Sequence, residues 1–87
     1  MVLLDLLGRR TALRVLWELR DRRLTFRALQ DAAETNPSVL NARLKELRDA
    51  LIIDHDDQGY GLTAQGQTLL EKFLPLHNWA DEWDKQF

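Results

Sequence analysis

The segment from residue 36 to residue 51 constrains the fold most, because it combines a helix start with a regular leucine stripe. Asn36 can accept a hydrogen bond from a free N–H group of the first turn, and Pro37 suits the first helical position because it has no N–H to leave unpaired. The leucines that follow at spacings of four, three and four are Leu40, Leu44, Leu47 and Leu51. At about 100° per residue they share one face, so we predict a helix over 37–49 whose leucine face, with Leu51, packs into a core.

The opposite face of this helix carries small and polar side chains, which include Ser38, Asn41, Ala42 and Lys45. Short side chains let a helix settle deep in the DNA major groove, where Asn41 and Lys45 can hydrogen-bond to base edges. We therefore predict base contacts from these four residues. The alternative, from the pattern alone, is an ordinary amphipathic helix on the protein surface.

Composition excludes several classes of protein. With 45% hydrophobic and 30% charged residues, the 87-residue chain is typical of one folded domain, and a second copy would help to stabilise its modest core. The chain has no cysteine, which excludes disulfides, thiolate chemistry and Cys-ligated zinc. No apolar run approaches the ~20 residues that span a bilayer, and the first residues lack the basic start of a signal peptide. We expect a cytoplasmic protein that does not contact membranes.

The net charge of −2 is unevenly distributed along the chain. Residues 1–48 hold ten basic and six acidic side chains, whereas residues 49–87 hold two and eight. A basic first half suggests that one face meets an anion such as DNA. Charges on unrelated solvated faces would give the same counts.

Two helices are predicted in the first 20 residues. Residues 2–7 are mostly apolar and are followed by Gly8, a pattern typical of a small helix that ends at glycine. Residues 11–20 carry apolar side chains at helical spacing, which predicts a core helix. Its expected core positions are Leu13, Leu16, Trp17 and either Leu19 or Arg20.

A third helix is predicted to start after Thr25, which can cap it, and to end near residue 35. Its apolar side chains are Phe26, Leu29, Ala32 and Ala33. Only a few residues separate it from Pro37, so the two helices must cross closely. This arrangement is typical of a helix-turn-helix over about 25–49.

A β-hairpin is predicted over about 52–62. Ile52 and Ile53 are β-branched, residues 56–59 form a turn that contains glycine, and Tyr60 begins a second short strand. Leu24 can add one residue to this small sheet. Three helices followed by a hairpin are typical of a winged helix, in which the hairpin is the wing.

The last predicted helix covers about 64–86 and starts after a capping threonine, Thr63. A helix of ~22 residues is about 33 Å long, and its apolar stripe is larger than one small domain can cover. We therefore expect its distal half to pair with a second copy of the chain. The predicted dimer contacts are Leu3, Leu4, Leu76, Trp79, Ala80, Trp83 and Phe87. The alternative is that Trp79 and Trp83 fold back on the core of their own chain.

The motifs identify a resemblance that covers nearly the whole chain. Residues 24–29, 36–47, 60–66 and 76–83 resemble the HxlR-type winged-helix transcription regulators, relatives of the MarR group. The more specific pieces are Leu62-Thr63 with Gly66, and Trp79-Ala80. The expected fold is mainly α with a small β-hairpin: a single winged helix-turn-helix domain over 1–87 with a long C-terminal dimerisation helix. The resemblance implies a homodimer that binds double-stranded DNA, with helix 37–49 in the major groove and the wing on the backbone.

Some residues depart from the family pattern. Leu51 replaces the glycine that commonly ends the recognition helix, and the cysteine that some members use as a redox sensor is absent. The wing carries Asp54, Asp56 and Asp57, which would repel phosphates. Phosphate contacts are therefore predicted from Arg9, Arg10, Arg23, Arg27, Arg43 and Arg48. For Arg43, a structural salt bridge is an equal alternative.

The sequence contains no recognisable catalytic set, so we expect neither an enzyme nor a cofactor. His55 lies among wing aspartates and His77 precedes Asp81 by four residues, but ordinary surface histidines explain both better than metal binding does. Two functions stay open. The first is an HxlR-type transcription regulator, with effector unknown. The second is a winged-helix protein-interaction module that does not bind DNA.

Overall fold

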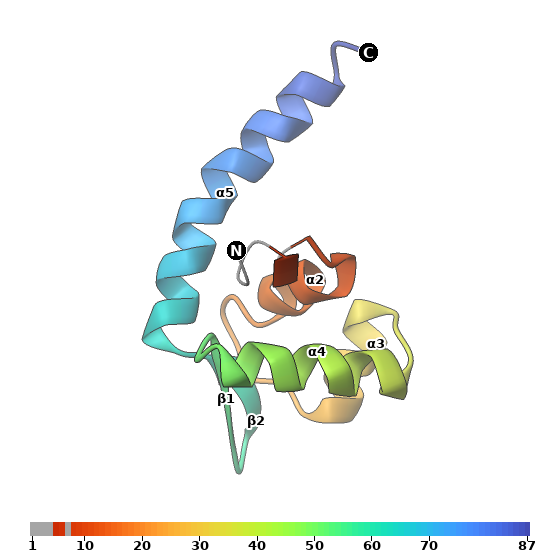
Figure 1. Cartoon of the computed structure of the whole chain (residues 1–87), viewed down its shortest axis with the longest axis vertical. Helices are drawn as coiled ribbons and strands as arrows, with labels where there is room; N and C mark the ends of the chain where they lie inside the picture. Colours follow the sequence, from red (N-terminus) through yellow and green to blue (C-terminus); the bar gives the residue numbers. More distant parts are fainter. Residues whose placement is uncertain (1–4, 7) are drawn as a thin grey trace.

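A computed structural model of the chain describes residues 5–6 and 8–87. The elements in that part are α2 (Arg10–Glu18), α3 (Phe26–Ala33), α4 (Pro37–Asp49), β1 (Ile53–Asp56), β2 (Gly59–Leu62) and α5 (Ala64–Asp84) (Figure 1). This order confirms the expected class, a mainly α winged helix-turn-helix with a long C-terminal helix. In the predicted helix over 2–7, Asp5 and Leu6 are helical, and the other positions lie outside the described residues.

Three helices begin where the capping residues predict. In each case a backbone N–H of the first turn donates a hydrogen bond to the side-chain oxygen of the residue before the helix. The pairs are Ala28 N to Thr25 Oγ1 (3.2 Å), Val39 N to Asn36 Oδ1 (2.9 Å) and Gly66 N to Thr63 Oγ1 (3.1 Å). Local sequence thus determines the starts of α3, α4 and α5.

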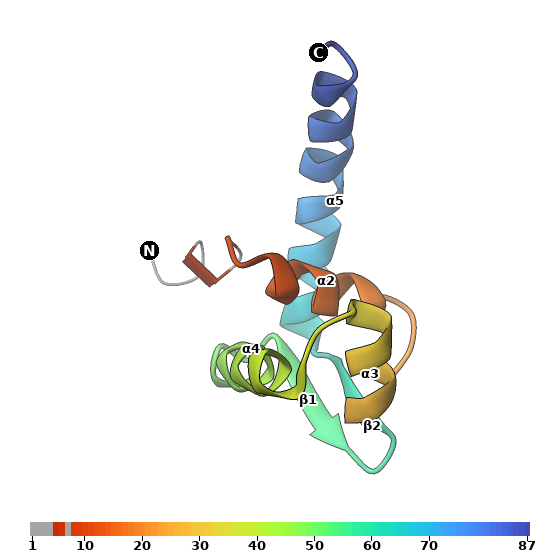
Figure 2. The same cartoon turned by 90° about the vertical axis from the view of Figure 1, so that its right-hand side faces the viewer.

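The hydrophobic core lies among α2, α3, α4 and the base of the hairpin, which Figure 2 shows gathered around one another. Its buried members are Leu6, Ala12, Val15, Leu16, Leu19, Leu29, Leu40, Leu44, Leu47, Ile52 and Ile53. The prediction for Trp17 was wrong, because its side chain is 42% exposed and the guanidinium of Arg20 lies 4.1 Å from its ring centroid. Val15 and Leu16 on the inner face of α2 and Leu19 just after the helix are buried, so the indole of Trp17 lies outside the core.

The end of α4 corrects the prediction for Leu51, which was expected in the core and is 63% exposed. Leu51 N donates to Arg48 O (2.9 Å) and Ile52 N donates to Leu47 O (3.0 Å), the two hydrogen bonds of a Schellman motif. This motif needs a left-handed residue just after the helix, and Leu51 has φ 63°. The chain turns there, so Ile52 enters the core in place of Leu51.

Leu51→Gly is expected to raise the free energy of unfolding by about 1 kcal/mol, because a left-handed backbone is unfavourable for a residue with a Cβ and open to glycine. Leu51→Ala is the matched control, since it removes the exposed side chain but keeps the unfavourable backbone. We expect it to change stability by less than about 0.5 kcal/mol. Guanidinium denaturation at one protein concentration measures both; a loss of stability in Leu51→Gly would contradict the backbone argument.

β1 and β2 pair antiparallel, with Asp54 opposite Gly61 and Asp56 opposite Gly59. Leu24 adds a one-residue bridge to Tyr60, as the sequence predicts. Gly59 has φ +113°, and a Cβ there would lie 2.3 Å from the carbonyl oxygen of Leu24. Glycine is therefore required at this position, both by the backbone conformation and by the close approach of the Leu24 backbone.

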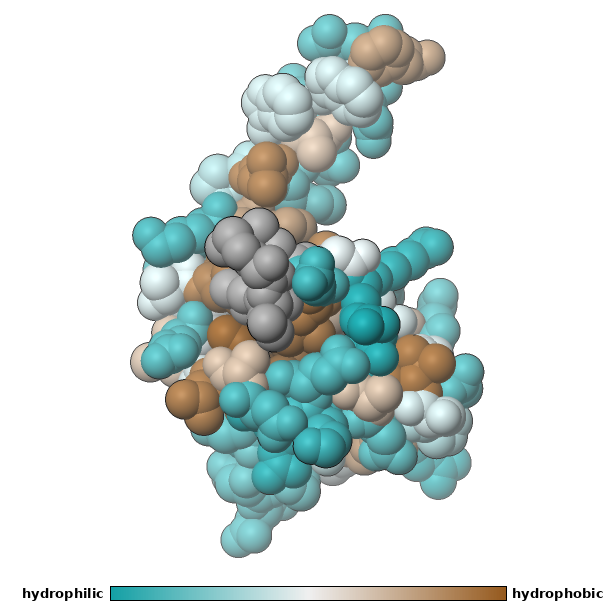
Figure 3. Space-filling view, viewed as in Figure 1, coloured by the Kyte–Doolittle hydropathy of each residue, from teal (hydrophilic) through white to brown (hydrophobic). Residues whose placement is uncertain are grey.

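α5 extends well beyond the rest of the molecule (Figure 1), and the longest dimension of the whole molecule is 43 Å. Leu70 near its start is buried, whereas the distal side chains Trp79, Trp83 and Phe87 are 61%, 48% and 90% exposed. Brown and pale surfaces follow the projecting part of the helix in Figure 3. The alternative in which the two tryptophans fold back on their own core is therefore wrong. None of the helices among the described residues combines the length and apolar character needed to cross a membrane.

Candidate nucleic-acid interface

α4 and the hairpin lie side by side at the end of the molecule opposite to the projecting end of α5 (Figures 1 and 2). A cavity of about 590 Å³ lies between them. Its lining residues are Asn41, Leu44, Lys45, Arg48, Asp49 and Tyr60. The sequence predicted the α4 side of this groove but missed Tyr60. Its position directly after the wing turn was the one available signal.

The predicted base-contact residues share one side of α4. Ser38, Asn41 and Lys45 are exposed, and Ala42 between them is half-buried. Lys45 Nζ lies 2.9 Å from Asp49 Oδ2, and both side chains are more than two-thirds exposed, at 77% and 68%. Exposed pairs of this kind contribute little to stability. The ammonium group can therefore exchange Asp49 for an anion or a base edge at small cost.

Two of the arginines predicted to contact phosphate are held by the same carboxylate. Arg43 lies 3.0 Å from Glu46 and Arg9 lies 3.7 Å from it, which joins α4 to the N-terminal end of α2. The Arg43 side chain is only 15% exposed. Its Nε is buried and has no hydrogen-bond partner among the described residues. The structure thus supports the structural alternative for Arg43.

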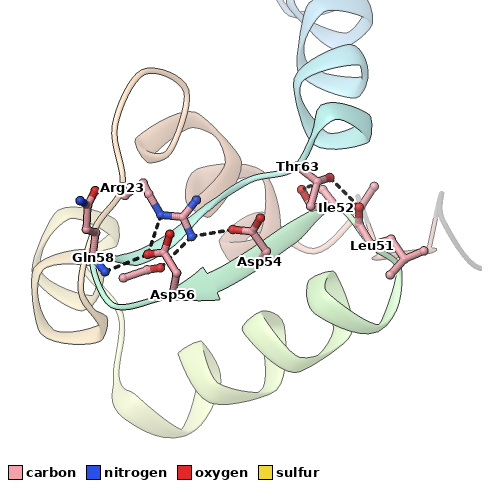
Figure 4. Close-up of polar contacts among 8 residues, drawn as sticks. Arg23, Leu51, Ile52, Asp54, Asp56, Gln58 and Thr63 are labelled. Atoms are coloured by element: carbon pink, nitrogen blue, oxygen red, sulfur yellow. Dashed lines mark hydrogen bonds and ion pairs between the residues drawn. The ribbon is translucent and has the colours of Figure 1, made fainter.

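Arg23 lies across the wing, with hydrogen bonds to both strands (Figure 4). Its guanidinium donates to Asp54 Oδ1 (2.5 Å), to Asp56 Oδ1 (3.1 Å) and to the carbonyl oxygen of Gly59 (2.9 Å). The hydrogen bond to Asp54, with the charges of both carboxylates, raises the pKa of Arg23 above its usual value. Like other arginines it is charged at physiological pH, and its charge is directed at the carboxylates of the wing.

The other three arginines are exposed, and the structure places them in different regions. Arg48 lines the groove beside Tyr60, and Arg27 lies in the first turn of α3. Within residues 5–6 and 8–87, neither makes an ion pair. Arg10 instead lines a separate cavity of about 640 Å³ between α2, the end of α3 and α5. Arg27 and Arg48 are thus the strongest candidates for phosphate contacts.

The two histidines weighed as possible metal ligands contact side chains close to them in the sequence. His55 stacks on Tyr60 with ring centroids 4.3 Å apart, and His77 Nε2 lies 3.4 Å from Asp81 Oδ2. No group of three or more potential metal ligands occurs in the described part of the chain. Among the predicted dimer contacts, those from Leu76 to Phe87 lie on the projecting part of the molecule, and Leu3 and Leu4 lie outside the described residues.

The geometry agrees with what comparisons with known proteins find. Residues 6–87 match the family model of the HxlR-like helix-turn-helix. Among solved structures, the chain is similar to the crystal structure of quinone-bound YodB from B. subtilis, with a TM-score of 0.78, 29% sequence identity and 90% of each chain covered. No curated protein matches the sequence. The chain therefore belongs to the HxlR-like helix-turn-helix family, a family of DNA-binding transcription regulators rather than of enzymes.

Proposed function

We propose that the protein regulates transcription as a homodimer that inserts α4 into the DNA major groove. One observation carries this proposal. The exposed polar side of α4 and the wing residue Tyr60 line one groove, at the end of the molecule opposite to the uncovered aromatic side chains of α5. Two such units joined through α5 would present two reading helices to one duplex.

Base recognition is assigned to Asn41 and Lys45. The Asn41 amide can donate to and accept from one adenine edge, and the Lys45 ammonium can donate to guanine acceptors. Ser38 and Ala42 are short enough to let α4 approach the groove floor. Phosphate contacts are assigned first to Arg27 and Arg48, which are exposed, and second to Arg9 and Arg10, which flank the start of α2. Arg9 must then exchange Glu46 for DNA.

The dimer contact is assigned to the distal part of α5. Trp79 and Trp83 stack with ring centroids 6.5 Å apart, and Trp83 lies 4.8 Å from Phe87, so the aromatic rings form one continuous surface. Exposed apolar patches of this kind mark association sites. A second copy would cover the patch. A twofold dimer reads half-sites about 34 Å apart, one turn of DNA.

Binding to genomic DNA fragments over a range of salt concentrations tests this function. Asn41→Ala is expected to weaken specific binding about 5- to 150-fold, which corresponds to about 1–3 kcal/mol for one base contact. Lys45→Ala should have an effect of similar size. Lys72→Ala, which removes an exposed charge from α5, is the control and should leave affinity nearly unchanged. Absence of binding at low salt would contradict the proposal, and so would Asn41 and Lys45 variants that bind as tightly as the unmodified protein.

The acidic wing favours a second candidate function, which is binding to another protein. Asp57 and its neighbours make the wing acidic, and carboxylates repel phosphates. A winged helix that uses the α4 groove to bind another protein would tolerate such a wing. A stable protein complex that covers Asn41 and Lys45, together with no DNA binding at low salt, would support this candidate over the first.

A further inference from the structure

Arg23 connects the wing to the segment that precedes α3. Two of its three wing partners are carboxylates of β1, 31 and 33 residues along the chain, and the third is the Gly59 carbonyl at the start of β2. Figure 4 shows the guanidinium lying along the hairpin between Asp54 and Asp56. Asp56 Oδ1 also accepts a hydrogen bond from Gln58 N (2.8 Å), which extends the network into the wing turn.

The hairpin has space for this side chain because Gly61 carries none. A Cβ at Gly61 would lie 2.3 Å from Arg23 Nη1 and 2.7 Å from Arg23 Cζ. Gly61 pairs with Asp54 across the two strands, so the glycine and the carboxylate form the floor and the side of one seat. The fold thus brings together three features that are far apart in the sequence. They are the aspartates of the wing, Gly61 and Arg23.

The two faces of the hairpin have different occupants. Side chains alternate along a strand, so Asp54 and Asp56 share one face, and His55 lies on the other. His55 stacks on Tyr60, which lines the groove beside α4. The seat of Arg23 is therefore on the face that does not carry Tyr60. Tyr60 is part of this hairpin, so a contact that holds the hairpin in place also holds Tyr60 in place relative to Asn41 and Lys45.

We propose that Arg23 is a positioning residue that holds the wing against the domain, and that it is not a phosphate contact. This inference rests on the DNA-binding function proposed above. The charge of Arg23 is paired with Asp54 and Asp56 within the protein, so it is not available to a phosphate. Its loss would leave these carboxylates unpaired and would hold the hairpin that carries Tyr60 less firmly, although the backbone of Tyr60 stays paired with Leu24.

DNA affinity and its salt dependence separate the two roles. Log K falls as log salt rises, and removing one phosphate contact makes this negative slope shallower by about 0.9. Removing a positioning residue lowers affinity without that change. We expect Arg23→Gln to weaken binding about tenfold with the slope nearly unchanged. Arg27→Gln is the matched control, and it should make the negative slope shallower by about one. A slope change in Arg23→Gln equal to that in Arg27→Gln would overturn the inference.

Gly61→Ala is a second test that alters no charge. Its methyl group would displace the guanidinium, so we expect it to weaken DNA binding about as much as Arg23→Gln does, about tenfold. The two changes combined should have no larger effect than either alone, because they disturb the same seat. Unchanged binding by Gly61→Ala, or additive effects of the two changes, would contradict the inference, because a phosphate contact needs no seat on the wing.

Nuclear magnetic resonance of the arginine Nε–H groups tests the seat without DNA. The Arg23 signal should exchange with water more slowly than that of exposed Arg27, and the difference should vanish in Gly61→Ala and in Asp54→Asn/Asp56→Asn. Equal exchange rates in the unmodified protein would overturn the seat itself. Absence of DNA binding by the unmodified protein would instead overturn the proposed function, so the two failures are distinguishable.

Discussion

Replacing Trp79 and Trp83 together with aspartate is expected to make the protein monomeric and to lower its affinity for DNA with two half-sites about 100-fold or more. Both rings are about half exposed or more in the single chain, at 61% and 48%, and they stack on each other. Charges at these positions would have to be buried without partners in a dimer. Once the two α4 helices are no longer joined, each half-site must bind independently, and the gain from linkage is lost.

The matched control for this prediction is Asn78→Asp/Lys85→Gln, which changes the net charge by the same two units on the side of α5 away from the tryptophans. It should keep both the dimer and the affinity. Sedimentation gives the oligomeric state, and titration of DNA gives the affinity. A monomeric unmodified protein, or a dimer that survives both aspartates, would refute the assignment of the interface to α5.

Gly66→Ala is expected to destabilise the fold by about 3 kcal/mol, although helix propensity alone predicts the opposite sign. Gly66 lies in the first turn of α5, is buried, and donates its N–H to Thr63. A Cβ at Gly66 would lie 2.1 Å from the carbonyl oxygen of Ile52, a backbone atom that cannot move without shifting the start of the hairpin. Thr63 Oγ1 also donates to Leu51 O (2.6 Å), which holds the same junction closed.

The exposed neighbour Gln65 gives the control, because Gln65→Ala changes a side chain in the same turn without meeting the backbone of Ile52. We expect it to alter the free energy of unfolding by less than about 0.5 kcal/mol. Denaturation must be compared at one protein concentration, since a dimer gains stability with concentration. A Gly66→Ala variant as stable as the parent would mean that α5 can move away from the hairpin freely.

The sequence was most informative where structure depends on neighbouring residues. Thr25, Asn36 and Thr63 each accept a hydrogen bond from the first turn of the helix they precede, and this needs no contact from elsewhere in the chain. The leucine spacing of α4 likewise placed Leu40 and Leu47 in the core, because helical periodicity is local. The same periodicity failed at Leu51, where the helix had already ended.

The candidate interface was harder to predict, because the sequence shows which residues are basic but does not show which carboxylates they pair with after folding. It predicted six arginines as phosphate ligands and gave a salt bridge as an equal alternative only for Arg43. In the fold, Glu46 holds Arg43 and Arg9, and the wing holds Arg23. Trp17 shows the same limit, since helical spacing could not tell which of two adjacent apolar residues, Leu16 or Trp17, would face inward.

By itself the sequence determined the helix starts, the hairpin, the small polar side of α4 and the excess of apolar surface on α5, because each follows from residue types at short spacings. Tertiary structure alone decided which charges stay available, where Leu51 and Trp17 lie, and that Arg23 occupies a seat over Gly61. The physical reason is that the interactions act over different separations along the chain. Capping and periodicity act within a few residues, whereas an ion pair between Arg23 and Asp54 exists only after folding brings together groups 31 residues apart.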